Sequence, residues 1–368
     1  MPKIVGLKRL DDTIQRIKFV GDNWLMTWAQ NGKVYTNLCD GRGDGTTTWN
    51  TRPFILNGSP PDVSFEFIPT FPDLIAGEAP NVNRYYGFGI FAHGNNLYSY
   101  LSTPSRPFLP SGAKFCGVKL VHSPDLGKTW KNQDGSPMVY EQWHERNRSN
   151  MLFFNEPGDA FSLISVLQMG RNYEHNTDGY VYVYSPNGSI DGTMNQLAMA
   201  RVKKGKVLDR ASYEFFVAHN ADGSAKWDKD INRRGAAHTF PSGWVNVMYH
   251  PYAWQPCVVY NAPLGVYMMS SFGMASDSQG MWFARPSYLG FWTAKTPWGP
   301  WTQIHEDKAW MPRGDQNARC YQPQIAPHWI APDGKSFWLI WTDFQEIKGQ
   351  GLPYYCFNFQ KVDLLLET

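Results

Sequence analysis

Two aspartates bracket a short hairpin-like stretch near the start of the chain. Asp22 opens the run DNWLMTWAQNGKVYTNLCD and Asp40 closes it, while the Asn31-Gly32 pair between them is a turn signal flanked by strand-forming segments. In an antiparallel hairpin the two aspartates therefore lie at the same open end. Neighbouring carboxyl groups push each other's pKa values apart, so that one is protonated and one ionised, as acid/base or nucleophilic chemistry requires. We expect Asp22 to be the ionised partner and Asp40, in a Gly-flanked loop, to be the proton donor.

Strand-forming segments of this kind recur in five groups along the chain of 368 residues, which gives each group about 74 residues. A group of four strands with generous loops has the size of a propeller blade. We therefore predict an all-β fold, a single five-bladed β-propeller domain of four-stranded blades over residues 1–368. The fifth group lacks an outer strand, which we expect the N-terminal residues 14–20 (IQRIKFV) to supply so that the ring closes without an open edge.

One motif supports this repeated architecture. The stretch SPDLGKTW (123–130) matches the Asp-box pattern S-x-D-x-G-x-x-W, which in sialidase-like propellers forms the turn between the third and fourth strands of a blade. The Asp-box is a structural device. We therefore assign Asp125 to the turn and give it no catalytic role.

The propeller topology predicts which residues share a site. The start of each blade's first strand and the end of its second lie on one face, around the mouth of the central channel. This rule gives Asp22, Asp40 and Glu156 as candidate catalytic residues. The candidate substrate-binding residues of the same face are Trp254, Gln255, Gln322, Asp343, His250, Arg148 and Arg319. Carboxylates, amides, arginines and aromatic rings together suit a carbohydrate ligand.

Each candidate acid also has a structural interpretation. Asp22 could cap the turn into its strand, and Glu156 could serve only the turn that begins at Pro157. Asp40 and Asp44 could be ordinary loop acids or ligands of a bound cation. We expect no cofactor and no catalytic metal, and these loop acids leave a structural Ca²⁺ ion open as the alternative.

The composition narrows the class of partner. A formal charge of +2, from 34 basic and 32 acidic residues, provides no basic surface for nucleic acid, and no apolar run has the length of a membrane span. Five separated cysteines without a CxxC pair argue against a disulfide framework or a structural zinc site.

The N-terminal residues lack the apolar core of a signal peptide, which leaves a cytoplasmic protein and a processed secreted form both open. We expect a monomer that binds a polysaccharide or oligosaccharide and neither nucleic acid nor a membrane.

Several stretches resemble one known family. They are the hairpin DNWLMTWAQNGKVYTNLCDGRGDG (22–45), DGYVYVYS (178–185) and PCVVYNAPLGVYMM with PWGPW (256–269 and 297–301). They resemble a group of five-bladed propeller proteins, formerly of unknown function, that includes endo-D-arabinanases and is distantly similar to other five-bladed furanosidases. The resemblance implies a secreted glycoside hydrolase whose catalytic pair is Asp22 and Asp40.

Two other functions remain open on this scaffold. A polysaccharide lyase would use His250 or Tyr252 to remove the proton beside a uronate carboxyl group, and Arg148 or Arg319 to neutralise that carboxylate. A glycan-binding propeller without catalysis would use the same polar and aromatic residues for affinity alone. The hydrolase is the leading interpretation, and the sugar, the linkage, the cleavage mode and the stereochemical outcome are not fixed by the sequence.

Overall fold

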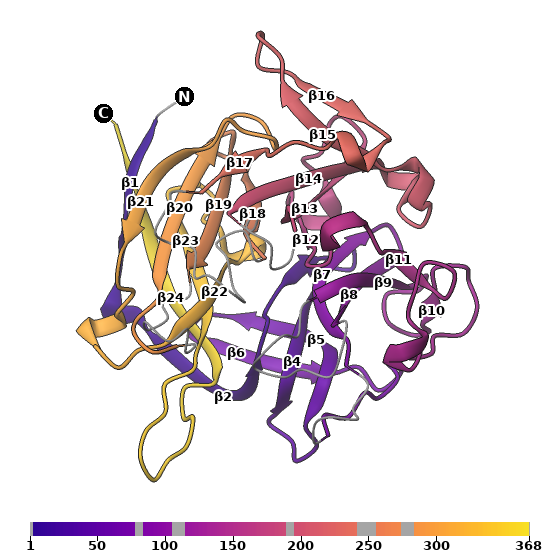
Figure 1. Cartoon of the computed structure of the whole chain (residues 1–368). Coiled ribbons are helices and arrows are strands. Elements are labelled where there is room, and N and C mark those ends of the chain that lie inside the picture. The colour runs from indigo at the N-terminus through magenta and orange to yellow at the C-terminus, as the bar shows by residue number, and fades with distance from the viewer. Residues whose placement is uncertain are drawn as a thin grey trace.

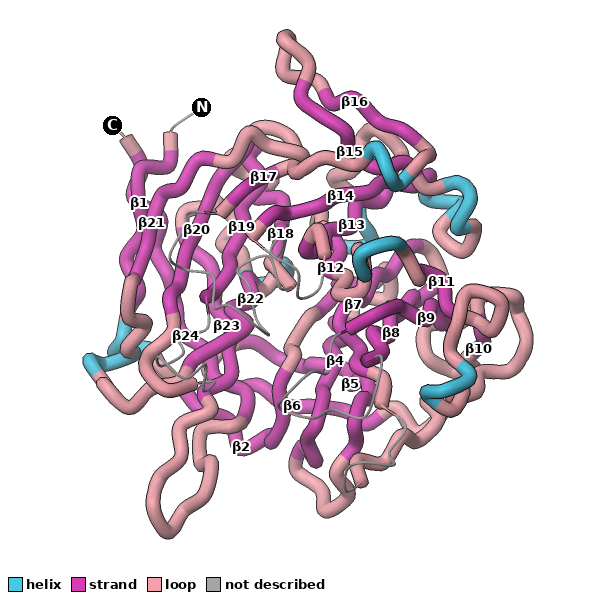
Figure 2. Tube along the Cα trace, in the orientation of Figure 1, coloured by secondary structure: helices cyan, strands magenta, loops and turns pink. Residues whose placement is uncertain are grey.

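The structure is a computed structural model that describes residues 3–77, 84–104, 115–188, 195–240, 255–273 and 283–367. Five groups of antiparallel strands follow one another around a ring (Figure 1). This confirms the predicted all-β five-bladed propeller. Within the described ranges the helical segments are single 3₁₀ turns (Figure 2), and no helix there is long and apolar enough to cross a membrane. These turns span Asp11–Thr13, Trp143–Glu145, Pro157–Asp159, Arg171–Tyr173, Lys204–Lys206, Arg210–Ser212, Ile231–Arg233, Pro312–Gly314 and Pro327–Trp329.

The strands of the first three blades follow the order of the sequence groups. Blade one contains β3 (Met26–Trp28), β4 (Val34–Gly43), β5 (Trp49–Ser59) and β6 (Asp62–Phe67). Blade two contains β7 (Tyr86–His93), β8 (Asn96–Pro104), β9 (Phe115–Ser123) and β10 (Lys131–Asn132), with β11 (Leu152–Phe154) also paired to β9. Blade three contains β12 (Ser165–Val166), β13 (Tyr180–Pro186), β14 (Gln196–Lys203), β15 (Glu214–His219) and β16 (Ala225–Asp228), with β17 (His238–Thr239) paired to β14.

The last two blades complete the ring. Blade four contains β18 (Cys257–Asn261), β19 (Val266–Gly273), β20 (Tyr288–Ala294) and β21 (Thr302–Asp307). Blade five contains β22 (Cys320–Ile325), β23 (Ser336–Asp343), β24 (Cys356–Leu366) and the N-terminal strand β1 (Ile4–Arg9). The two ends of the chain therefore lie side by side in this blade (Figure 1).

The N-terminal segment closes the ring with two strands. β1 pairs with the last part of β24, from Arg9 opposite Val362 to Ile4 opposite Leu366. The following strand, β2 (Gln15–Asp22), pairs first with the start of β24 and then with β4 of blade one. The outer strand of blade five is therefore β1, which corrects the prediction that residues 14–20 occupy this place. Those residues instead join blades five and one into one continuous sheet.

Aromatic side chains fill much of the space between the blades. Trp24, Trp292, Trp310 and Trp341 are each at most 1% exposed. The indole N–H of Trp24, which follows β2, donates to Oγ1 of Thr342 in blade five at 2.8 Å, so its buried polar atom has a partner. A large share of the aromatic content thus serves packing rather than ligand binding.

The Asp-box turn lies between β9 and β10, as its sequence predicts. The Asp125 carboxylate accepts hydrogen bonds from the backbone N–H groups of Lys128 at 3.1 Å and Thr129 at 2.8 Å, and from Ser123 Oγ at 2.7 Å. These bonds lower the pKa of Asp125 although burial opposes them. Asp125 therefore closes a turn between the third and fourth strands of blade two.

Candidate active site

The hairpin brings Asp22 and Asp40 together at one end of blade one. Asp22 is the last residue of β2 and pairs with Cys39 of β4, so that Asp40 is the next residue along the facing strand. Asn31 and Gly32 form the turn at the other end, where Gly32 has φ of 80° and its N–H donates to the Ala29 carbonyl at 3.0 Å. The structure thus places both acids at the open end, as the sequence predicts.

A glycine next to Asp40 makes this close approach of two strands feasible. Asp40 itself has φ of 41°, and the pairing register of β2 with β4 shifts between Val20 and Asp22. A Cβ atom on Gly41 would lie 2.3 Å from the Val20 carbonyl oxygen and 2.4 Å from the Gly21 Cα. Only glycine fits where β4 passes over β2, and this packing fixes the direction in which the backbone presents Asp40.

The Asp22 carboxyl group lies in an environment that favours its protonated form. Burial, and next the negative charge of Asp40, raise its pKa from 3.8 to about 7. Hydrogen bonds to the carboxylate from Tyr321, Tyr355 and Asn23 oppose this rise but do not cancel it. The Tyr321 hydroxyl donates to Asp22 Oδ2 at 2.7 Å, and the Asn23 amide donates to Oδ1. At neutral pH Asp22 therefore exchanges a proton readily, as a general acid must.

Asp40 has partners that favour its ionised form. The pKa of Asp40 is raised above its ordinary value by burial, and hydrogen bonds from the Asn50 amide and the Tyr86 hydroxyl and the charge of the Arg84 guanidinium oppose this rise. Asn50 Nδ2 donates to Asp40 Oδ1 at 2.8 Å, and Arg84 Nη1 lies 4.0 Å from Oδ2. Arg84 also donates to the Tyr86 hydroxyl at 2.7 Å. The charge that acts on Asp40 is the positive charge of Arg84, whereas the charge that acts on Asp22 is the negative charge of Asp40.

Blade two holds these partners of Asp40 in place. The Tyr85 backbone N–H donates to Asn50 Oδ1 at 2.7 Å, so that Asn50 links blade two to Asp40. Arg146, from the segment 141–150 that precedes β11, donates to the carbonyl of Arg84 and lies 3.6 Å above the Tyr85 ring. Glu141 in turn accepts hydrogen bonds from the Tyr85 hydroxyl at 2.6 Å and from Lys119 Nζ at 2.7 Å. A buried polar network therefore positions the chain that carries Arg84.

Glu156 is held in an ion cluster. Its Oε1 atom accepts hydrogen bonds from Arg148 and from both Nε and Nη2 of Arg210, at 3.0 and 2.7 Å for Arg210. Only 8% of Glu156 is exposed, whereas about half of the Arg148 side chain is. The structure joins the predicted residues Glu156 and Arg148 to each other, and these contacts give Glu156 a structural task in blade three.

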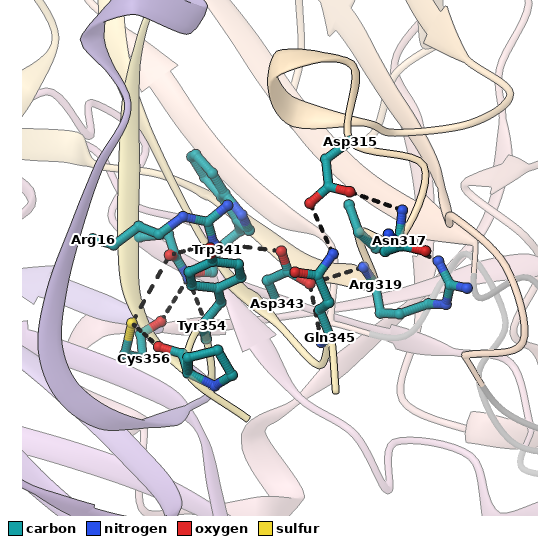
Figure 3. A network of polar contacts seen from close by, with 12 residues as sticks. Arg16, Asp315, Asn317, Arg319, Trp341, Asp343, Gln345, Tyr354 and Cys356 are labelled. Atoms are coloured by element: carbon teal, nitrogen blue, oxygen red, sulfur yellow. Dashed lines mark hydrogen bonds and ion pairs between the residues drawn. The ribbon is translucent and has the colours of Figure 1, made fainter. Parts of the chain in front are cut away.

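Asp343 and Arg319 are also joined, in the network of blade five shown in Figure 3. Asp343 is fully buried, and its Oδ1 accepts from the backbone N–H groups of Arg319 at 2.8 Å and Gln345 at 3.1 Å, while Oδ2 accepts from Arg16 at 3.4 Å. The Arg319 side chain donates to backbone carbonyls, including that of Phe283 at 2.6 Å. These contacts hold the loop after β23 and leave the Asp343 carboxylate enclosed by protein.

The two predicted glutamines contact each other. Gln322 Nε2 donates to Gln255 Oε1 at 2.7 Å, and both side chains are at most 1% exposed. The pair links blade five to the segment just before β18 of blade four, because Gln255 lies two residues before that strand. The other two predicted binding residues, Trp254 and His250, lie outside the described residues.

Several residues that contact the acids were not predicted from the sequence, among them Arg84, Tyr321, Asn50 and Tyr355. Arg84 precedes β7, the first strand of blade two, so the rule applied to the other blades could have found it. Tyr321 is the neighbour of Gln322 on β22, where a one-residue difference in strand phase changes which side chain faces the acids. Asn50 and Tyr355 gave no signal, because their positions depend on how β5 and β24 pair with other strands.

The described residues contain no group of three or more histidines, cysteines, aspartates or glutamates placed to hold a metal ion. The side chains named above hold the two carboxyl groups in place. The chemistry that they can perform is proton donation by one carboxyl group and nucleophilic or basic action by the other.

Comparisons with known proteins identify relatives by fold alone. No protein-family model matches the chain, and no curated protein does. Among solved structures, a candidate hydrolase from Bacteroides ovatus is 14% identical over 95% of this chain and 87% of its own, with a TM-score of 0.53. A thermostable family-43 glycoside hydrolase is 12% identical over 95% of this chain and 90% of its own, with a TM-score of 0.50. At these identities the likeness shows a shared propeller fold.

Proposed function

We propose that the protein is a glycoside hydrolase that cleaves a polysaccharide or oligosaccharide with Asp22 and Asp40. The observation that carries this proposal is a pair of carboxyl groups at adjacent strand positions in unlike environments. Glycoside hydrolysis needs one protonated and one ionised carboxyl group beside the scissile bond. The likeness of the fold to a family-43 glycoside hydrolase supports the same class of reaction.

The two environments favour a division of labour opposite to the one expected from the sequence. Asp22, with a pKa of about 7, is the proton donor to the leaving-group oxygen. Asp40, beside Arg84 and Asn50, is the ionised partner that attacks the anomeric carbon or activates a water molecule. Asp40 lies within β4 and not in a loop, 37% of its side chain is exposed, and its partners come from two blades.

The hydrogen-bond donors around Asp22 suit a carboxyl group that releases a proton and takes it up again. Tyr321 and Tyr355 have pKa values raised well above the usual range, chiefly by burial, so they remain protonated donors. When Asp22 has released its proton, they stabilise the carboxylate until it is protonated again. The separation of the two carboxyl groups in the substrate complex sets the outcome, with retention at about 5–5.5 Å and inversion at about 6.5–9.5 Å.

The substrate class that we propose is a furanoside of the arabinan type. The support for it is the resemblance of the hairpin that carries Asp22 and Asp40 to a family with endo-D-arabinanases. The segment 141–150 is not among the stretches that resemble this family, and its Arg146 donates to the carbonyl of Arg84 beside the acid pair. We therefore propose the class of sugar, and experiment must determine the linkage.

The described contacts give less support to a lyase. Arg148 is engaged with Glu156, and the Arg319 guanidinium donates to backbone carbonyls, so neither is presented to a uronate carboxylate. Burial raises the pKa values of Tyr321 and Tyr355 well above the usual range, so both stay protonated and cannot accept the proton, while His250 and Tyr252 lie outside the described residues. A binding module without catalysis remains the third function, and activity measurements separate it from the hydrolase.

Product analysis tests the proposed function. The protein is incubated with a panel of arabinans and other plant, algal and mycobacterial polysaccharides, and the products are examined for new reducing ends and for ultraviolet absorption. We expect reducing ends without the absorption of an unsaturated uronate. An absorbing product identifies a lyase, and binding of a glycan without any cleavage identifies a binding module.

A further inference from the structure

An exposed aromatic ring lies beside the acid pair, and the acid/base chemistry does not use it. Phe344 directly follows Asp343 at the end of β23, and 38% of it is exposed. Its backbone is fixed on both sides, because its own N–H donates to the Arg319 carbonyl at 2.9 Å and both neighbours belong to the network of Figure 3. Gln345, for example, donates from Nε2 to Asp315 at 2.8 Å. Phe344 is thus an apolar ring held towards solvent by a rigid backbone.

The neighbours of this ring connect it to Asp22. Phe283 stacks on Phe344, with the ring centres 4.8 Å apart and the planes at 22°. Tyr355 and Tyr321 meet it edge to face at 5.7 and 6.4 Å between ring centres. The Tyr321 hydroxyl donates to the Asp22 carboxylate at 2.7 Å, and the Tyr355 hydroxyl donates to the Asp40 carbonyl at 3.3 Å, so only one ring separates Phe344 from each of the two acids.

This arrangement suits a sugar ring. A stacked phenylalanine pair with exposed ring surface offers a flat, electron-rich area to the apolar C–H groups of a sugar, while Asp22 and Asp40 lie to one side. We infer that Phe344, supported by Phe283, is a stacking platform for the sugar unit next to the one whose bond is cleaved. The inference rests on the proposed function and adds a binding subsite to it, so that the substrate has at least two sugar units.

Binding measurements in a background without turnover test the platform. In the Asp40→Asn protein, titration calorimetry gives Kd for linear arabinofuranose oligosaccharides of increasing length. We expect Phe344→Ala to raise Kd about tenfold, a loss of the size that one aromatic contact supplies, and Phe344→Tyr to restore it. The matched control is Phe67→Ala on β6, where an exposed phenylalanine (45%) lies on the outer strand of blade one. That variant should bind like the parent.

Activity measurements complete the test. On a substrate that the otherwise unmodified protein cleaves, Phe344→Ala should raise KM and leave kcat within a small factor. Unchanged Kd and KM in Phe344→Ala would overturn the platform and leave the hydrolase intact. If no oligosaccharide binds to the parent and none is cleaved, the proposed function and the platform fall together.

Discussion

Replacing Asp22 by asparagine should stabilise the protein at alkaline pH while it abolishes activity. The folded pKa of about 7 lies above the ordinary value of 3.8, so the folded state binds the proton more tightly than the unfolded state. Between these two values a rise in pH therefore lowers the free energy of unfolding. Asparagine carries no charge at any pH and removes this penalty. The asparagine side chain also finds hydrogen-bond partners. The Tyr321 hydroxyl can donate to its oxygen. The side-chain amide of Asn23 can flip, so that its buried Oδ1, which has no partner among the described residues, accepts from the new N–H group.

The size of the effect follows from the pKa shift. The full difference of about three pKa units corresponds to roughly 4 kcal/mol, and the part between pH 5 and pH 7 to about 2.7 kcal/mol. For a chain of 368 residues the unfolding entropy is about 0.8 kcal/mol/K, so this part equals about 3–4 °C in Tm. Relative to the parent, the Tm of Asp22→Asn should therefore rise by about 3–4 °C when the buffer changes from pH 5 to pH 8.

Thermal unfolding followed by circular dichroism at pH 5 and pH 8 measures this difference directly. The matched control is Asp44→Asn, an exposed acid just after the same hairpin, whose Tm difference from the parent should not depend on pH. A Tm difference for Asp22→Asn that is equal at the two pH values, or that falls at pH 8, refutes the reasoning. Asp22 would then not hold a raised pKa, and its assignment as proton donor would fail.

Three further substitutions test the partners of the acids. Tyr321→Phe removes a hydrogen bond to the Asp22 carboxylate, so the pKa of Asp22 should rise. The alkaline limb of kcat/KM against pH should then move to higher pH by about half a unit to one unit. A shift of this limb to lower pH contradicts the prediction. Arg84→Gln removes the positive charge beside Asp40, so the acid limb should move to higher pH, and an unmoved limb means that Arg84 does not tune Asp40. Glu156→Gln should lower the free energy of unfolding by about 2 kcal/mol, seen as a lower Tm, because Glu156 binds Arg148 and Arg210. The variant should keep the kcat of the parent. A collapse of kcat with an unchanged Tm would make Glu156 catalytic.

Local sequence patterns predicted the fold well and the closure of the ring less well. Turn signals such as Asn31-Gly32 and the Asp-box act over a few residues, so they located the hairpin and the blades. The N-terminal strands β1 and β2 both pair with β24, which lies at the other end of the chain. No local property decides which of two strand-forming segments pairs with a distant strand, and the outer place was therefore given to the wrong one.

The candidate site was also predicted only in part: the positions of the two acids were predicted, but their roles were not. The position of the two acids followed from the hairpin, because their placement needs only one local pairing. Their roles depended on residues from elsewhere in the chain, namely Tyr321, Tyr355 and Arg84. These residues contribute the hydrogen bonds and the positive charge that make the two environments differ, and none is visible from the residues next to Asp22 or Asp40. Proton affinities are thus a property of the assembled blades.

The most direct test of the central claim is the rate of reducing-end release by the parent, Asp22→Asn and Asp40→Asn on one polysaccharide that the parent cleaves. We predict that each substitution lowers kcat by at least about 10²-fold, because each removes one half of the acid/base pair, while both variants unfold as cooperatively as the parent. If either variant retains the activity of the parent, the pair at the open end of the hairpin is not the catalytic pair.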